Sequence, residues 1–160
     1  MYQYILDLLP YKSSFRFVDE ISYLDQDKVI GNYTPKEDAF FYKDHFPGNP
    51  VTPGAILTEI MAQIGLVVLG IYLITLAPGQ AAPAGEGPAV LPANTPIFPL
   101  LTSTEVSFLR MALPGKKITV ISNREYFRFD KLKCTVEAQD DSGERLAKGT
   151  FSGIIKRINK

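Results

Sequence analysis

The segment from Pro53 to Leu76 constrains the fold most, because it is apolar on nearly every side of any helix that it could form. Glu59 is its only charged residue. Pro53 can occupy the first position of a helix, where its missing N–H needs no partner, and Thr52 is placed to cap that helix. A helix that is apolar all round must be buried. The chain therefore needs a sheet or a second subunit to cover it.

A membrane-spanning helix is the alternative for this segment. Its uncharged part, residues 64–77, has 14 residues, fewer than the roughly 20 that cross a bilayer. Extension back to Ala55 would reach spanning length, but it would place Glu59 and Gln63 in lipid, where polar groups are costly. We therefore expect a buried core helix and no membrane span.

Strand patterns surround the apolar segment. Residues 15–24 and 28–35 predict a β-hairpin, which follows a short helix that Pro10 ends. Residues 78–99 are rich in Pro and Ala and predict a loop insertion. Four more strands are expected over residues 103–111, 116–129, 131–141 and 145–157. This order predicts a single domain, residues 1–160, of the α+β class, with a mostly antiparallel sheet over one long helix.

Charge and cysteine content exclude several functions. Lys plus Arg equals Asp plus Glu, at 17 each, so the chain lacks the cationic excess of a generic nucleic-acid binder. His45 and Cys134 are the only residues of their types, which leaves too few ligands for a zinc site. Cys134 lies in an alternating strand pattern and is expected in the core. With one cysteine and no signal-peptide pattern, we expect a cytoplasmic location.

The stretch from His45 to Gln63 collects residue types suited to proton transfer. His45 precedes the rigid turn FPGNP, and a neutral imidazole is a competent base near pH 7. Glu59 lies in the apolar helix, where desolvation favours the protonated acid. Gln63 is four residues further on, on the same helical face, and can orient the carboxyl. At Gly54, the helix N-terminus offers backbone N–H groups to a developing oxyanion.

This set suits proton removal beside a carbonyl combined with protonation of a leaving hydroxyl. Such a reaction eliminates water from a β-hydroxyacyl group. The same residues also fit a purely structural interpretation, in which His45 packs a turn and Glu59 interacts with the helix dipole. Taken residue by residue, both interpretations stay open.

The motif HFPGNPVTPGAILTEIMAQ closely resembles the active-site segment of the FabZ family of β-hydroxyacyl-acyl carrier protein dehydratases. That family carries His-Phe-Pro-Gly-x-Pro-x-x-Pro-Gly, followed by Glu and Gln on a helix. The matching positions are His45, Phe46, Pro47, Gly48, Pro50, Pro53, Gly54, Glu59 and Gln63. The flanking segments LLPYKSSFRFVDEI and VSFLRMALPGKKI are also similar to family segments, so the resemblance covers most of the chain.

The resemblance implies a hotdog fold, an antiparallel sheet wrapped around a long central helix. It also implies a homodimer, or a trimer of such dimers, in which the His of one subunit faces the Glu of the other. In that arrangement His45 is the base, Glu59 the acid, Gln63 the orienting residue and the Gly54 N–H the donor to the thioester carbonyl. No cofactor and no metal are implied.

The implied substrate is (3R)-3-hydroxyacyl-acyl carrier protein, which would become the trans-2-enoyl form in fatty-acid or related polyene or polyketide synthesis. The implied tunnel residues are Phe46, Pro53, Ile56 and Ile60. Basic residues of the second half, above all Arg110 and Arg128, are candidates for docking the acidic carrier protein, although such residues are also common on solvated strand faces. The rival functions are a hotdog thioesterase, an enoyl-CoA hydratase and a non-catalytic dehydratase-like partner subunit.

Overall fold

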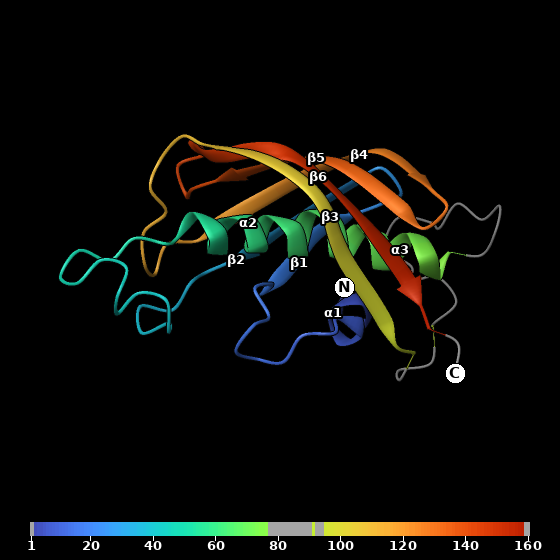
Figure 1. The fold of residues 1–160 in the computed structure, drawn as a ribbon, viewed down its shortest axis with the longest axis horizontal. Coiled ribbons are helices and arrows are strands. Elements are labelled where there is room, and N and C mark those ends of the chain that lie inside the picture. The colour runs from blue at the N-terminus through green and yellow to red at the C-terminus, as the bar shows by residue number, and fades with distance from the viewer. Residues whose placement is uncertain (1, 77–90, 92–94, 159–160) are drawn as a thin grey trace.

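The structure is a computed structural model, and it describes residues 2–76, 91 and 95–158. The elements in chain order are α1 (Gln3–Leu8), β1 (Glu20–Leu24), β2 (Lys28–Tyr33), α2 (Gly54–Ala62), the π-helical stretch η1 (Gln63–Val68), α3 (Leu69–Thr75), β3 (Ile97–Phe108), β4 (Ile118–Arg128), β5 (Lys131–Gln139) and β6 (Arg145–Arg157). Figure 1 shows the sheet lying over the long helix.

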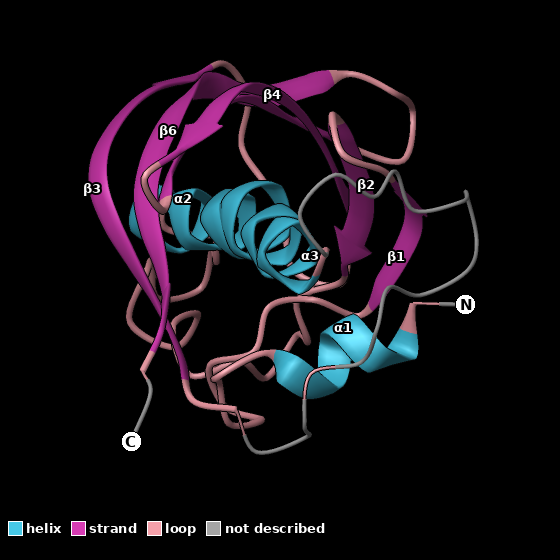
Figure 2. Ribbon diagram, turned by 90° about the vertical axis from the view of Figure 1, so that its right-hand side faces the viewer, coloured by secondary structure: helices cyan, strands magenta, loops and turns pink. Residues whose placement is uncertain are grey.

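The six strands form one sheet in the order β1-β2-β4-β5-β6-β3, and every pair in it is antiparallel. Seen along the helix, the sheet curls around α2 and α3, and α1 lies on the side that the sheet leaves open (Figure 2). The predicted α+β class and the hotdog architecture are confirmed.

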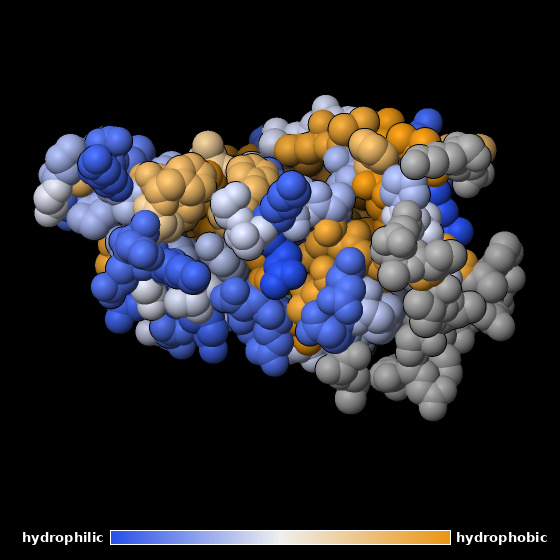
Figure 3. Space-filling view, turned by 90° about the horizontal axis from the view of Figure 1, so that it is seen from below, coloured by the Kyte–Doolittle hydropathy of each residue, from blue (hydrophilic) through white to orange (hydrophobic). Residues whose placement is uncertain are grey.

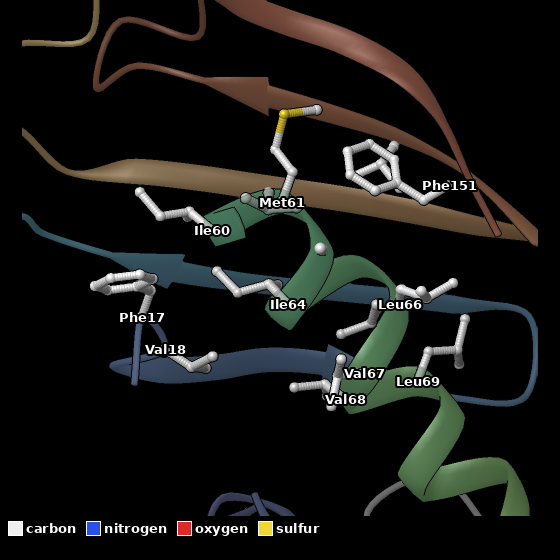
Figure 4. Close-up of a cluster of buried hydrophobic side chains, with 14 of the residues drawn as sticks. Phe17, Val18, Ile60, Met61, Ile64, Leu66, Val67, Val68, Leu69 and Phe151 are labelled. Carbon is white, nitrogen blue, oxygen red and sulfur yellow. The ribbon is translucent and has the colours of Figure 1, made fainter. Parts of the chain in front are cut away.

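The stretches α2, η1 and α3 make one continuous helix, Gly54–Thr75, of 22 residues. By length and composition alone this helix could cross a membrane, but 83% of its most apolar window is buried inside the fold. Figure 4 shows Ile60, Met61 and Ile64 among the buried side chains of this helix, with Phe151 of β6 nearby. The expectation of a core helix is confirmed.

Two glycines let the helix lie directly against the sheet. A Cβ at Gly70 would stand 2.4 Å from Cγ1 of Ile155, and one at Gly65 would stand 2.8 Å from Cγ1 of Val136. The buried Ser122 hydroxyl of β4 donates a 2.8 Å hydrogen bond to the Gly65 carbonyl. The helix and the sheet are therefore held together by close packing and by a polar contact within the π-helical stretch.

Three predicted boundaries are wrong. The first strand begins at Glu20 and not at Phe15, because the backbone of Phe15 and Phe17 is held by the Gln63 side chain of the long helix. Hydrogen bonding to β2 starts with the Asp19 N–H, which donates to the Asn32 carbonyl at 2.9 Å. The predicted loop 78–99 extends too far, since Ile97 already pairs with Arg157 in β3; residues 78–90 and 92–94 lie outside the described part of the chain. Strand β3 also ends at Phe108 and not at residue 111.

Strand β3 forms one edge of the sheet and pairs only with β6. Pro99 is tolerated within it because an edge strand has N–H positions that need no partner. Its side chains are unusually exposed for apolar residues: Phe98, Leu100, Leu101 and Phe108 are 45–60% accessible. Figure 3 shows one face of the molecule, where apolar side chains in orange gather in patches among hydrophilic ones. A long exposed apolar edge of this kind is a surface for pairing with another chain.

Candidate active site

His45 sits in a turn that the backbone itself fixes. The Val51 N–H donates to the His45 carbonyl at 3.0 Å, and the Asn49 N–H donates to the Phe46 carbonyl at 3.0 Å. Gly48 has a φ of +77°, in the left-handed region that glycine adopts without strain. The loop therefore holds the imidazole on a defined backbone.

The hydrogen bond of the His45 ring selects its tautomer. Nδ1 lies 2.9 Å from the Val51 carbonyl oxygen. A carbonyl oxygen can only accept, so Nδ1 carries the proton, and Nε2 of the neutral ring keeps a free lone pair. Phe46 stacks on the imidazole with 4.3 Å between ring centroids. The half-buried ring is thus oriented to take up a proton at Nε2.

Tyr42 and Thr52 anchor the loop where it enters the long helix. Both are buried, and their hydroxyl oxygens lie 2.6 Å apart. The Thr52 N–H donates to the Ala112 carbonyl at 2.8 Å, which ties the loop to the segment before β4. The prediction that Thr52 caps the helix is wrong: Pro53 occupies the cap position, and no side chain makes a capping hydrogen bond there.

The N-terminus of α2 presents the backbone of Gly54. The first N–H groups of a helix have no partner within it. A Cβ on Gly54 would come within 3.2–3.4 Å of the Phe108 ring of β3. The missing side chain therefore allows this ring to lie directly against the helix start.

Glu59 and Gln63 belong to one hydrogen-bond network on the long helix. Nε2 of Gln63 donates to Oε1 of Glu59 at 2.9 Å and to the Phe15 carbonyl at 2.8 Å. Oε1 of Gln63 accepts from the Phe17 N–H at 2.7 Å. Gln63 is fully buried and Glu59 is half-buried. The expected orientation of Glu59 by Gln63 is present, and the same amide also holds the chain before β1.

Within one protomer the His45 ring and the Glu59 carboxylate are bonded to different groups. The ring bonds to Val51, and the carboxylate bonds to Gln63. In Figure 1 the loop that carries His45 extends beyond the start of α2, whereas Glu59 lies five residues inside the helix. One protomer therefore supplies both groups without joining them.

The remaining predicted residues occupy different environments. Ile60 is fully buried, Pro53 and Ile56 are half-buried, and Phe46 is 57% exposed. Cys134 is buried in the core as expected, and burial is the main cause that raises the pKa of its thiol to about 11. No three His, Cys, Asp or Glu side chains of the described residues are grouped as metal ligands.

Arg110 and Arg128 lie near opposite ends of the sheet. Arg110 lies two residues before Ala112, which contacts the His45 loop, and it forms an exposed 3.0 Å ion pair with Glu144. Arg128 lies at the end of β4, with its guanidinium 5.2 Å from the centre of the Tyr126 ring. Its neighbour Phe127 shares a cavity with the C-terminal end of α3. The two arginines therefore do not share one surface of the protomer.

The family model for the FabA-like domain matches residues 9–124, which include the His45 loop, the long helix and β3. The chain belongs to the FabA-like family. The match covers more than half of the chain.

Curated relatives of the chain include enzymes named FabZ. The chain is 43% identical over 68 residues to the 3-hydroxyacyl-[acyl-carrier-protein] dehydratase FabZ of Caldicellulosiruptor saccharolyticus, which is 41% of this chain and about half (47%) of that protein. It is 28% identical over 157 residues to the FabZ of Rickettsia felis, covering 95% of this chain and 93% of that protein.

Solved structures of the same fold include dehydratases and thioesterases. The dehydratase heterocomplex ApeI:P from Xenorhabdus doucetiae superposes with a TM-score of 0.70 at 15% identity, covering 98% of this chain and 91% of the other. A hypothetical thioesterase with coenzyme A from Streptococcus pneumoniae has a TM-score of 0.56 at 12% identity, with 88% coverage of both chains. These likenesses concern the fold alone.

Two contributions to this FabA-like site are not visible in the sequence pattern. The backbone of Phe15 and Phe17 supplies hydrogen-bond partners for the Gln63 amide, although the sequence of this segment predicts a strand. Tyr42 anchors the His45 loop through Thr52, but it appears in the sequence as part of an aromatic loop. Gln63 was the available signal in the sequence for the first of these contributions. The amide of a glutamine that is buried in an apolar helix must find hydrogen-bond partners.

Proposed function

We propose that the protein is a 3-hydroxyacyl-[acyl carrier protein] dehydratase, which converts the (3R)-3-hydroxyacyl thioester to the trans-2-enoyl thioester. The observation that supports this most is the pairing of an imidazole with a free Nε2 and a carboxyl group oriented by Gln63, both near the N-terminus of one buried helix. The FabZ relatives support the same reaction.

The proposed mechanism assigns one proton transfer to each group. Nε2 of His45 removes the proton from the α-carbon, and the electron pair forms the new carbon–carbon double bond. Glu59 protonates the hydroxyl on the β-carbon, whose carbon–oxygen bond breaks to release water. The Gly54 N–H donates to the thioester oxygen, on which negative charge develops. The reaction is redox-neutral, and its atoms balance without a cofactor.

A homodimer completes the proposed site. The base of one subunit would meet the acid of the other, because the two groups have separate partners within one protomer. The exposed apolar edge of β3 supports pairing with a second copy of the chain. A trimer of such dimers is compatible with this arrangement. The tunnel residues Phe46, Pro53, Ile56 and Ile60, and a cytoplasmic location, belong to the same proposal.

Two rival reactions use the same class of substrate. A hotdog thioesterase would release a free thiol, and an enoyl-CoA hydratase would act in reverse on coenzyme A thioesters. A non-catalytic partner subunit would do neither; the presence of both His45 and Glu59 argues against it. Primary fatty-acid synthesis and polyene or polyketide synthesis would both use the proposed reaction.

The deciding assay incubates purified protein with a 3-hydroxyacyl-carrier-protein thioester and follows enoyl formation and free thiol. We expect enoyl product and no thiol. The variants His45→Ala and Glu59→Gln should each lose activity by about a thousandfold, within the range for general acid–base groups, with unchanged circular dichroism. Thiol release by the wild type, or normal turnover by either variant, would refute the proposal.

A further inference from the structure

The turn between β4 and β5 carries an aromatic ring that touches almost nothing in the protomer. Phe129 is 98% exposed, the highest value among the large apolar side chains of the described residues. The next carbonyl, that of Asp130, accepts from the Ile155 N–H at 2.9 Å, which fixes the turn to β6. Asp130 also lines a cavity with Leu76, at the C-terminal end of α3. The ring therefore projects from a fixed turn at the end of the long helix remote from Gly54.

The backbone of this turn disfavours a bulky residue. Phe129 and Asp130 have φ values of +51° and +61°. Two residues with positive φ between paired strands form a turn for which asparagine and glycine are preferred. A large side chain in this region of φ is strained. The ring thus costs stability and buries nothing within the protomer, which points to a use outside the fold of one protomer.

Two basic side chains flank the ring. Arg128 and Lys131 stand opposite each other in the β4–β5 hairpin, and both are exposed. Neither forms an ion pair with any of the described residues, whereas Arg124 and Lys133 in the same hairpin do pair with acidic side chains. Asp130 is the only acidic residue of the turn, so the positive charge around Phe129 is in excess.

The same residues form an open groove of about 490 Å³, which we call the distal groove. The Arg128 guanidinium lies 5.2 Å from the centre of the Tyr126 ring, a cation–π contact. Ile155 is fully buried, so its neighbour Ile154 points to the face of the sheet that lies away from the helix. The residues that line the groove are Tyr126, Arg128, Phe129, Lys131 and Ile154. It therefore combines two unpaired cations with aromatic and aliphatic surface.

This combination fits the interface of an anionic lipid bilayer. Cations near such a surface are attracted by its headgroups, and an aromatic ring gains by entering the boundary between headgroups and acyl chains. A second copy of the chain bound through the same groove would bring Arg128 and Lys131 against their equivalents, and like charges oppose that contact. A folded acidic protein would need a pocket shaped for the Phe129 ring, whereas a bilayer accepts the ring without one.

We propose that the distal groove binds the surface of an anionic membrane, with Phe129 inserted at the level of the headgroups and with Arg128 and Lys131 in contact with phosphate oxygens. One ring and two cations make a weak, reversible anchor. Two grooves in a dimer would bind more tightly than one, because the second contact forms within the same complex. The contact does not involve His45 or Glu59, so it is independent of the proposed reaction.

Sedimentation with vesicles tests the charges. We expect the full chain to sediment with vesicles of phosphatidylcholine that contain about one third phosphatidylglycerol, and not with vesicles of pure phosphatidylcholine. Added salt should release it. Arg128→Gln combined with Lys131→Gln should weaken binding by at least about tenfold. The matched control is Lys116→Gln combined with Lys117→Gln, which removes the same charge from two exposed lysines that line a different cavity. Equal losses in the two double variants would overturn the assignment.

Phe129→Asn tests the ring. Asparagine suits a turn with positive φ, so this variant should unfold at the same or a higher urea concentration than the wild type. Its affinity for the anionic vesicles should nevertheless fall by about tenfold, the effect of losing a buried aromatic ring. The matched control is Phe40→Asn, which removes another exposed ring (65%) and should bind as the wild type does. Unchanged binding of Phe129→Asn would show that the ring does not enter the membrane.

A fluorescent reporter gives a second readout, because the chain contains no tryptophan. The emission of Phe129→Trp should move to shorter wavelength when anionic vesicles are added, and that of Phe40→Trp should stay unchanged. A wild-type protein that does not sediment with anionic vesicles would refute the proposal. So would an emission shift of Phe129→Trp that requires an acidic protein in place of lipid, since it would assign the groove to a protein partner.

Discussion

Nε2 of Gln63 lies 2.9 Å from Oε1 of Glu59, one turn away on the same buried helix. The oxygen of the same amide accepts a hydrogen bond from the Phe17 N–H, and its nitrogen donates one to the Phe15 carbonyl. One fully buried side chain thus joins the predicted acid to a segment 46 and 48 residues away in sequence. The geometry of the site and the stability of the fold depend on the same group.

Replacement of Gln63 by Ala should therefore destabilise the protein and slow the reaction. It removes three hydrogen bonds and leaves the buried Phe17 N–H unpaired. We expect the free energy of unfolding to fall by about 2–4 kcal/mol, measured by urea denaturation. Gln3→Ala is the matched control, because Gln3 makes the same type of four-residue contact to Asp7 on an exposed helix. Similar losses in both variants would contradict the role of Gln63.

We expect that no side chain fits at position 70 as long as the side chain of Ile155 packs against it. A Cβ would lie 2.4 Å from Cγ1 of this fully buried isoleucine. Gly70→Ala should cost about 1–3 kcal/mol of unfolding free energy through overpacking, even though alanine favours helix. In the Ile155→Ala background the same change should cost nothing, and a double-mutant cycle from denaturation curves measures this coupling. An equal cost in both backgrounds would show that the close approach is not what requires glycine.

The sequence was sufficient for the core of the fold. The apolar run from Pro53 identified a buried helix, because no other environment accommodates a helix without a polar face. Alternation located two of the later strands, since β4 and β5 each bury every second side chain over part of their length. These inferences succeeded because local periodicity records burial directly.

The errors arose where tertiary contacts override local pattern. Residues 15–19 alternate like a strand, yet the Gln63 amide binds the backbone of Phe15 and Phe17 in place of a neighbouring strand. Ile97 and Pro99 looked like loop because of the surrounding prolines, but an edge strand tolerates proline. The link from Gln63 to the backbone of Phe15 and Phe17 could not be read from sequence, because it depends on how the chain before β1 packs on the long helix.

The exposed edge of β3 should be required for dimer formation. Leu100→Lys combined with Leu101→Lys places charges on two of the four exposed apolar residues of this edge, which opposes strand pairing. We expect the double variant to sediment as a monomer and to lose dehydratase activity. Phe129→Lys is the control, since Phe129 is 98% exposed on the turn between β4 and β5. A dimeric, active double variant would show that β3 is not the interface.

Charge reversal separates the two candidate docking residues. Arg110 lies near the segment that contacts the His45 loop, whereas Arg128 lies toward the other end of the helix. Arg110→Glu should reduce turnover of the carrier-protein thioester by about tenfold, the effect of losing a favourable charge contact, and should spare a short thioester mimic. Arg128→Glu should have a smaller effect. Equal losses with both substrates, or a larger effect at Arg128, would remove this assignment.

A hybrid dimer tests the central claim, that His45 of one subunit acts with Glu59 of the other. Subunits carrying His45→Ala and Glu59→Gln, each with its own affinity tag, are co-expressed and purified through both tags. One of the two sites in every hybrid then holds neither group, and the other holds both. We predict about half of the wild-type rate from two parents that are each inactive. A hybrid as inactive as its parents would show that the two groups do not act across the subunit boundary.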